Sequence, residues 1–149
     1  MPVMGATRFQ RFFRQAAGLQ VDKDDLKRYG DFVENKLYDL LIMGEAAAKE
    51  NHRDFILPHD LPITRGLQDS VHKFRKLDEA IELAPILDRL ATYPPLDRSL
   101  AEDTEARLPE LVGGLSYALA QAFTIVEPER RNPQTAQWER IQRLFDLLL

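Results

Sequence analysis

Residues 21–60 read VDKDDLKRYGDFVENKLYDLLIMGEAAAKENHRDFILPHD, and this stretch decides the fold. Asp22 and Asp25 have the spacing of an N-cap and its capping box, so a helix is predicted to begin at Asp22. Small or apolar residues then recur every three or four positions to about Asn51, at Leu26, Gly30, Val33, Leu37, Leu40, Leu41, Gly44, Ala47 and Ala48. Such a helix would be roughly 40 Å long. Its apolar stripe therefore requires a comparable helix to cross it.

Shorter helices are predicted on both sides of this long one. The stretch from Thr7 to Ala17 has its phenylalanines on one side and its arginines on another, and Gly18 ends it. After a brief extended segment, Asp60 is predicted to cap a third helix over Leu61 to Lys76, with Pro62 in the first turn. The first half of the chain is therefore short helix, long helix, short helix.

The second half repeats this plan when the first half is shifted by 75 positions. A short helix is predicted over Glu79 to Ala91 and a last helix over Thr135 to Leu149. Between them, Ser99 and Glu102 have capping-box spacing and are predicted to open the second long helix. The chain thus contains an internal duplication of three helices.

Two features inside the second long helix carry structural expectations. Pro109 cannot donate a backbone hydrogen bond, so a kink or a late start of the helix is expected there. Gly113 and Gly114 lie near its middle, where the absence of side chains permits close approach of another helix. We expect that other helix to be the first long helix.

Composition places the chain among soluble globular proteins. It has 149 residues, 44% hydrophobic and 30% charged, which is enough for one sizeable core. It has no apolar run long enough for a membrane span and no signal-peptide core at its start, so a cytoplasmic protein is expected. Without cysteine it has no disulfide or thiolate site. Its net charge of -4 argues against a protein dedicated to phosphate binding.

The layout resembles the histone fold, in which two brief loops join a short, a long and a short helix. The second loop carries Arg53, with Asp60 seven residues later, and the similarity is closest over residues 11–25 and 49–63. Two such units in one chain resemble the prokaryotic double-histone family. The resemblance implies an all-α protein in which tandem histone folds, residues 6–76 and 77–149, pair as an intramolecular pseudodimer within one compact domain of residues 1–149.

The resemblance also assigns a structural role to Arg53 and Asp60. In histone folds the matching residues form an ion pair that ties the loop to the start of the third helix, and a paired arginine and carboxylate fix geometry well. The matching positions of the second half hold Pro128 and Thr135, so no equivalent clamp is visible there. Arg130 or Arg131 could approach from nearby.

DNA contacts implied by the resemblance are only partly present. The arginine of the first short helix is matched by Arg11, and Arg14 follows three residues later. The first-loop arginine falls on Gln20, and a lysine and threonine of the second loop fall on Asp54-Phe55. In the second half the counterpart of Arg11 is Ile86. The residues expected to contact DNA are Arg8, Arg11, Arg14, Lys23 and Arg53.

Larger assemblies are expected to be restricted. In archaeal histones a histidine at the end of the long helix contributes to polymerisation, and here that position is Glu50. Glu50 beside another copy's Asp60 would bring two like charges together. We therefore expect a monomer that contains its own pseudodimer, with no extended chains, although other oligomers are left open.

Patterns for catalysis or metal binding are weak. His52 and His59 lie near Asp54 and Asp60 but lack a recognised ligand spacing. Ser116 lies in a sequence similar to a nucleophile elbow, yet it falls in the middle of a helix. Acidic residues at the start of the second long helix favour its dipole. We predict no catalytic residues, no metal and no cofactor.

Two functions remain open from the sequence. The first is a histone-like architectural protein that associates weakly, and without sequence preference, with double-stranded DNA. The second is a module that has kept the histone fold, lost DNA binding and pairs with another protein. The resemblance favours the first, whereas the acidic balance favours the second.

Overall fold

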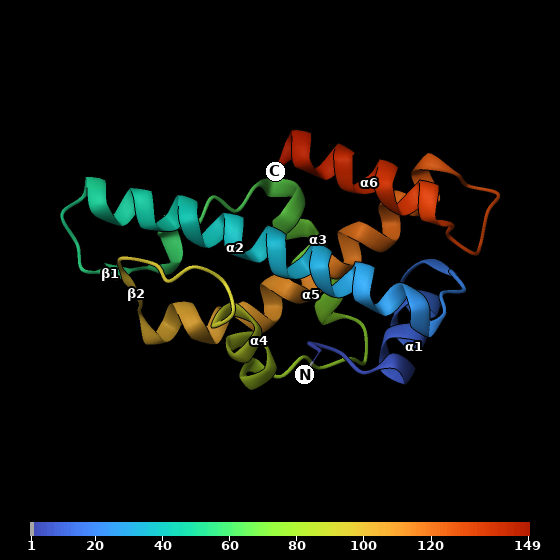
Figure 1. The fold of residues 1–149 in the computed structure, drawn as a ribbon, viewed down its shortest axis with the longest axis horizontal. Helices are drawn as coiled ribbons and strands as arrows, with labels where there is room; N and C mark the ends of the chain where they lie inside the picture. The colour runs from blue at the N-terminus through green and yellow to red at the C-terminus, as the bar shows by residue number, and fades with distance from the viewer. Residues whose placement is uncertain (1) are drawn as a thin grey trace.

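The computed structural model describes residues 2–149 and contains two short-long-short sets of helices, as predicted (Figure 1). The first set is α1 (Ala6–Ala17), α2 (Leu26–Glu50) and α3 (Arg65–Arg75), and the second is α4 (Leu83–Leu90), α5 (Glu102–Val126) and α6 (Thr135–Leu148). Short 3-10 turns cover Lys23–Asp25 and Pro58–Asp60. The two long helices have the same length, 25 residues.

The two sets of helices join at both ends through paired loops. At one end β1 (Phe55–Ile56) and β2 (Ser99–Leu100) run parallel, with Phe55 beside Ser99. At the other end the backbone N–H of Gln20 donates to the carbonyl of Arg131 over 2.6 Å. Each pair combines the first loop of one set with the second loop of the other. This arrangement is the head-to-tail pairing expected of a histone pseudodimer.

The entry into α2 follows the predicted capping box. The Asp22 side chain accepts a hydrogen bond from the backbone N–H of Asp24 over 2.9 Å, and the Asp25 side chain accepts one from the N–H of Asp22 over 3.2 Å. These contacts satisfy the unpaired donors of the 3-10 turn that leads into the helix. The capping prediction is confirmed, with the regular α-helix beginning at Leu26.

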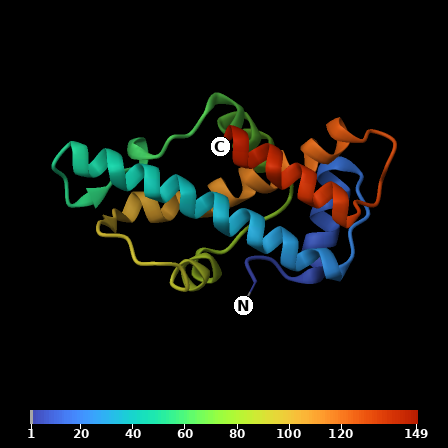
Figure 2. The ribbon, with the colours of Figure 1, turned by 45° about the horizontal axis from the view of Figure 1, so that its top comes forward.

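The long helices α2 and α5 cross at the centre, and the shorter helices pack around them (Figures 1 and 2). At the crossing, the Tyr29 hydroxyl lies 2.7 Å from the Ser116 hydroxyl, and Ser116 donates to the Val112 carbonyl. Burial raises the pKa of Tyr29 to about 12. The surrounding core is rich in aromatic residues, including Phe9, Phe12, Phe13, Phe32, Phe74, Phe123 and Trp138.

Two short helices begin later than predicted. Asp60 does not cap α3, because its side chain instead accepts from the N–H of Leu57 inside the 3-10 turn, and Thr64 is the cap. The fourth helix begins at Leu83, not at Glu79. A helix from Glu79 would place Pro85 in its interior, where its missing N–H would cost a hydrogen bond. With a start at Leu83, Pro85 lies in the first turn, where no helical hydrogen bond needs its N–H.

The predicted start of the second long helix is also wrong. Ser99 lies in β2, and α5 begins at Glu102 after Ala101, without a side-chain cap. Pairing of the loops at this end takes priority over the local capping pattern. The helix then runs through Pro109 without interruption, so the expected late start does not occur. The long helices are related by 76 positions, and α3 and α6 by 70.

The paired glycines of α5 accommodate α3 and not, as expected, α2. A Cβ atom added to Gly113 would lie 2.3 Å from the ring of Phe74, and one added to Gly114 would lie 2.5 Å from Cγ2 of Val71. Both contacts are closer than carbon atoms can approach. The short third helix therefore seats directly on the α5 backbone, while α2 crosses at Ser116. No helix within residues 2–149 is long and apolar enough to span a membrane.

Candidate nucleic-acid interface

The arginines of α1 point away from a buried aromatic face. Phe9, Phe12 and Phe13 are buried, so the helical period leaves Arg8, Arg11 and Arg14 toward the surface. Gly18 ends the helix in the left-handed conformation, at φ 66°. The helix contains no acidic residue. It therefore presents three guanidinium groups with no carboxylate of its own.

Glu79 engages two of these arginines. Its side chain is only 1% exposed and accepts from Nε and Nη2 of Arg11 over 2.7 and 3.2 Å, with Arg8 at 3.8 Å. This contact raises the pKa of Arg11 and neutralises part of the positive charge. The sequence did not predict this contact, because Glu79 lies 68 residues from Arg11 and was expected at the start of a helix.

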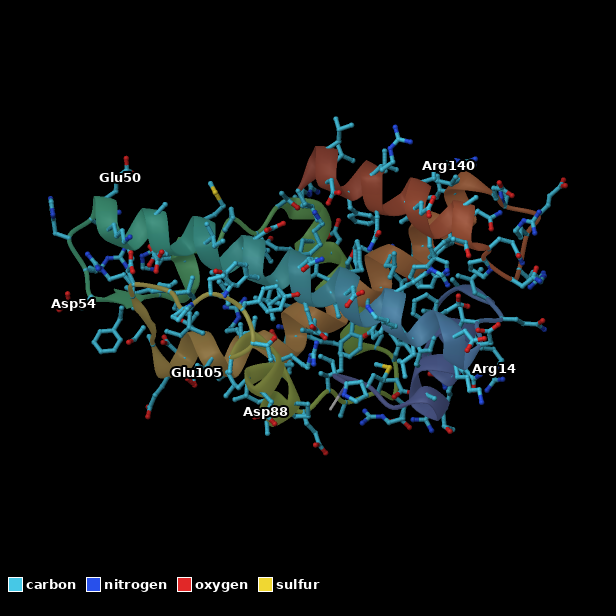
Figure 3. The ribbon with its side chains drawn as sticks, in the orientation of Figure 1. Arg14, Glu50, Asp54, Asp88, Glu105 and Arg140 are labelled. Carbon is cyan, nitrogen blue, oxygen red and sulfur yellow. The ribbon has the colours of Figure 1, made fainter. Side chains whose placement is uncertain are left out.

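Arg14 and Lys23 are the predicted residues without such a partner. Both are exposed, and neither takes part in an ion pair within residues 2–149. Arg14 is labelled in Figure 3, beside α1. Lys23 lies between Asp22 and Asp24, which reduces the local positive charge. Arg131 also reaches this end of the molecule, where its Nη1 lies 3.5 Å from the Gly18 carbonyl. Arg131 was considered only as a clamp residue from the sequence, not as a DNA contact.

Arg53 is occupied by the loop clamp. Its two terminal nitrogens donate to the two carboxylate oxygens of Asp60 over 2.5 and 2.6 Å, which is the ion pair implied by the histone resemblance. The Asp60 side chain is 2% exposed, and these hydrogen bonds lower its pKa to about 2. The bidentate pair engages two of the five N–H donors of the guanidinium and neutralises its charge. The assignment of Arg53 as a DNA contact stays a prediction.

The second half uses a different contact where the clamp is missing. The Thr135 hydroxyl accepts a hydrogen bond from Nη2 of Arg28, which lies on α2, over 2.8 Å. Arg130, which we considered for this role, instead pairs with Glu127 at 3.3 Å. The start of α6 is thus tied to the opposite half of the molecule by a neutral hydroxyl. Sequence comparison of the two halves gave no indication of Arg28.

Both loop ends, where histones hold phosphates, carry more acidic than basic residues. Residues 45–60 and 96–105, at the β1 and β2 end, include eight acidic and three basic residues, a net charge of -5. Residues 18–25 and 127–134, at the other end, include five acidic and three basic residues, a net charge of -2. A net negative charge at both loop ends does not favour a polyanion there.

The last turn of α3 adds basic residues that the sequence analysis did not select. Lys73 and Lys76 are exposed, and they enter none of the ion pairs formed within residues 2–149. Arg75, between them, donates to Glu110 over 2.7 and 3.2 Å. The run Lys73-Phe74-Arg75-Lys76 is visible in the sequence, but its neighbours in space are not.

A metal centre has no counterpart in the described part of the chain. Among residues 2–149 no three histidine, aspartate or glutamate side chains are grouped to hold an ion. His52 has a positive φ of 56° in the tight turn after α2, and His59 lies 3.9 Å from Asp60. These two histidines are accounted for by their positions in the loop.

Comparisons with known proteins agree with this architecture. A family model described as a domain of unknown function, DUF1931, matches residues 9–146. A crystal structure from Thermus thermophilus is 53% identical, with a TM-score of 0.95 over 99% of each chain. A crystal structure from Aquifex aeolicus is 22% identical, with a TM-score of 0.83 over 96% of this chain and 94% of the other. A curated protein of that organism, described as uncharacterized, is 24% identical over 95% of this chain and 82% of its own length.

The fold is also shared with a histone. The crystal structure of the histone from Methanopyrus kandleri superposes with a TM-score of 0.63, over 93% of this chain and 92% of that one. The sequence identity is 17%, so this similarity concerns the fold alone. It confirms the prediction of an all-α histone pseudodimer.

Proposed function

The chain belongs to the DUF1931 family and has a histone fold, and from this we propose that it associates weakly and without sequence preference with double-stranded DNA. The observation that carries the proposal is the row of Arg8, which is partly exposed, and Arg11 and Arg14, which are exposed, on a helix without acidic residues. Guanidinium groups suit phosphate contacts, which position DNA without reading its sequence. The protein then acts as an architectural component and performs no catalysis.

The affinity is expected to be low for two reasons. Glu79 competes with phosphate for Arg8 and Arg11, and both loop ends carry net negative charge. Each phosphate that a protein neutralises contributes about one unit to the slope of log affinity against log salt concentration. Three arginines therefore predict a slope of about -2 to -3 and binding on the order of micromolar at low salt.

Fluorescence anisotropy of a labelled random-sequence duplex, titrated over a salt series, tests this proposal. We expect Arg11→Glu/Arg14→Glu to abolish binding. The matched control is Arg140→Glu/Arg143→Glu on α6, which makes the same charge change on two exposed arginines and should weaken binding only slightly. Arg140 is labelled in Figure 3. Absence of wild-type binding at low salt, or equal losses in the two variants, would contradict the proposal.

A second candidate function, pairing with another protein, is favoured by an exposed apolar groove. The groove has a volume of about 290 Å³ and is lined by Lys36, Asp39, Leu40, Met43, Pro62, Thr64, Leu148 and Leu149. Met43 is 57% exposed and Leu148 is 73% exposed. Asp39 and Asp146 are both exposed, and both form ion pairs with the buried Lys36. An apolar groove with an excess of carboxylates matches an amphipathic helix that carries basic residues beside its apolar face.

This candidate is tested with a fluorescent amphipathic peptide composed of leucine and lysine. Met43→Asp/Leu148→Asp should weaken peptide binding by at least about tenfold, because it places charge in the apolar contact. Phe55→Asp is the matched control, since Phe55 is an exposed apolar residue in β1. Binding by the groove variant that is as tight as, or tighter than, binding by the wild type would contradict this candidate, because it would show that the peptide does not use the groove.

A further inference from the structure

The positive charge of this acidic protein is concentrated in two helices. Residues 6–17 and 65–76, which form α1 and α3 with its C-cap, contain seven basic residues and one acidic residue, a net charge of +6. The remaining residues contain 13 basic and 23 acidic residues, a net charge of -10. A separation of this size creates a local positive potential despite the total charge of -4.

Aromatic packing brings the two helices together. The rings of Phe12 on α1 and Phe74 on α3 have centroids 5.9 Å apart, so the last turn of α3 lies against α1. Lys73 is adjacent to Phe74 in sequence and Lys76 follows it by two residues, just as Arg11 is adjacent to Phe12. The exposed lysines thus flank a residue that contacts α1, as Arg11 flanks the residue that contacts α3.

The chain beyond α3 continues along α1. Glu79, three residues after Lys76, reaches both Arg8 and Arg11. This contact fixes the turn after α3 beside the outward face of α1. Arg75 is paired with Glu110, as Arg11 is with Glu79, so Lys73 and Lys76 are the basic residues at this end of α3 that enter no ion pair within residues 2–149.

Helix dipoles explain only part of this arrangement. Lys73 lies in the last turn of α3, where a positive charge is favourable. Arg8 lies in the first turn of α1, where the dipole disfavours a positive charge. Basic residues nevertheless concentrate on these two helices, which meet at Phe12 and Phe74, whereas the loop ends are negative. A ligand that binds all along this face explains both helices together.

We propose that α1 and the last turn of α3 form one phosphate-binding strip, in which Lys73 and Lys76 extend the row of Arg8, Arg11 and Arg14. The inference rests on the proposed DNA association and specifies its surface. Duplex DNA then contacts the protein over these two helices and not over the paired loops. At about 1.5 Å per residue, α1 is about 18 Å long, which matches a few successive phosphates of one strand.

The salt dependence of DNA binding tests this surface. With the two lysines added to the three arginines, the salt slope of the wild type should be about -4 to -5. In the anisotropy assay, Lys73→Gln/Lys76→Gln should weaken binding and return the slope to the value of about -2 to -3 expected of the three arginines alone, one unit for each lost phosphate contact. Arg140→Gln/Arg143→Gln is the matched control and should leave the slope unchanged. If the lysine variant had the same slope as the control, the strip would be overturned. The proposed function would stay intact as long as the wild type bound DNA and Arg11→Glu/Arg14→Glu did not.

Lysine footprinting provides a second test on the native sequence. Acetylation of the wild-type protein with and without duplex DNA, read by mass spectrometry, should show slower modification of Lys73 and Lys76 when DNA is bound. Lys27 on α2 is 85% exposed and serves as the internal control whose modification should not change. If bound DNA changed the modification rates of Lys73 and Lys76 no more than that of Lys27, the strip would be overturned. Absence of any DNA binding would overturn both the strip and the proposed function.

Discussion

Substitution of Gly114 by alanine tests how closely α3 seats on α5. The added Cβ would lie 2.5 Å from Cγ2 of Val71, and 3.1 and 3.2 Å from the Val71 backbone N and Cα. A side chain can rotate away, but the backbone atoms of α3 can be relieved only if the helix shifts. That shift would loosen the packing of Val71 and Phe74, which are both buried.

The magnitude follows from two opposing contributions. Alanine in place of glycine inside a helix stabilises by about 1 kcal/mol. Overpacking of a filled core costs about 1 to 3 kcal/mol, and contact with the backbone of a neighbouring helix belongs at the upper end. We therefore expect Gly114→Ala to lower the free energy of unfolding by about 2 kcal/mol, or the melting temperature by about 5 °C.

The assay is thermal and urea unfolding followed by circular dichroism, with Gly66→Ala as the matched control. Gly66 lies in the first turn of α3, and a Cβ there would meet nothing within 4 Å. Its replacement should stabilise the protein by about 0.5 kcal/mol, from helix propensity alone. If Gly114→Ala were as stable as the wild type, α3 would not lie on the α5 backbone and our explanation of the paired glycines would be wrong.

Three further changes test individual contacts. The pKa of Asp60, about 2 in the folded protein, lies below its ordinary 3.8, so the clamp should stabilise fully above about pH 4 and lose its effect as the pH falls toward 2. Asp60→Asn should then lower the free energy of unfolding by about 1 to 2 kcal/mol at pH 7, a range that allows for solvent screening near the arginine. The loss should disappear below pH 2, as measured by urea unfolding at a series of pH values. Tyr29→Phe removes the hydroxyl contact with Ser116 and should cost about 1 kcal/mol in the same assay, because Ser116 keeps its backbone acceptor. Thr104→Val removes a buried 2.7 Å hydrogen bond to the Ile56 carbonyl and should cost about 1 kcal/mol, whereas no loss would show that this bond does not hold α5 to β1.

The sequence predicted the elements that depend on local chemistry. The helical period of α2, its capping box and the seven-residue spacing of Arg53 and Asp60 are all visible within 40 residues. The predictions that were wrong concern contacts between distant segments. Ser99 had a valid capping pattern, but pairing with Phe55 in the other half determined its conformation. The starts of α3 and α4 are the exceptions, because their causes are local: Asp60 accepts from Leu57 three residues earlier, and Pro85 favours a start at Leu83.

The candidate interface was less predictable than the fold for the same reason. The three arginines of α1 could be selected because they share one helix without acids. Glu79, which partly neutralises two of them, reaches α1 only through the turn after α3. Lys73 and Lys76 join the surface through the contact of Phe74 with Phe12. A charge pattern along the sequence does not show which residues share a face.

The contacts that join the two halves do not depend on phosphate. At one end the backbone N–H of Ala101 donates to the Ile56 carbonyl, and at the other that of Gln20 donates to Arg131. The side-chain contacts beside them differ, an ion pair at the first end and the Thr135 hydroxyl with an arginine at the second. Because backbone pairing fixes the loops at both ends, their surface charge can vary without loss of the fold. Single acidic residues of the loop ends, such as Asp22 and Asp60, hold local structure, but the net negative charge there bears on what the protein binds and directs the search for a DNA contact to α1 and α3.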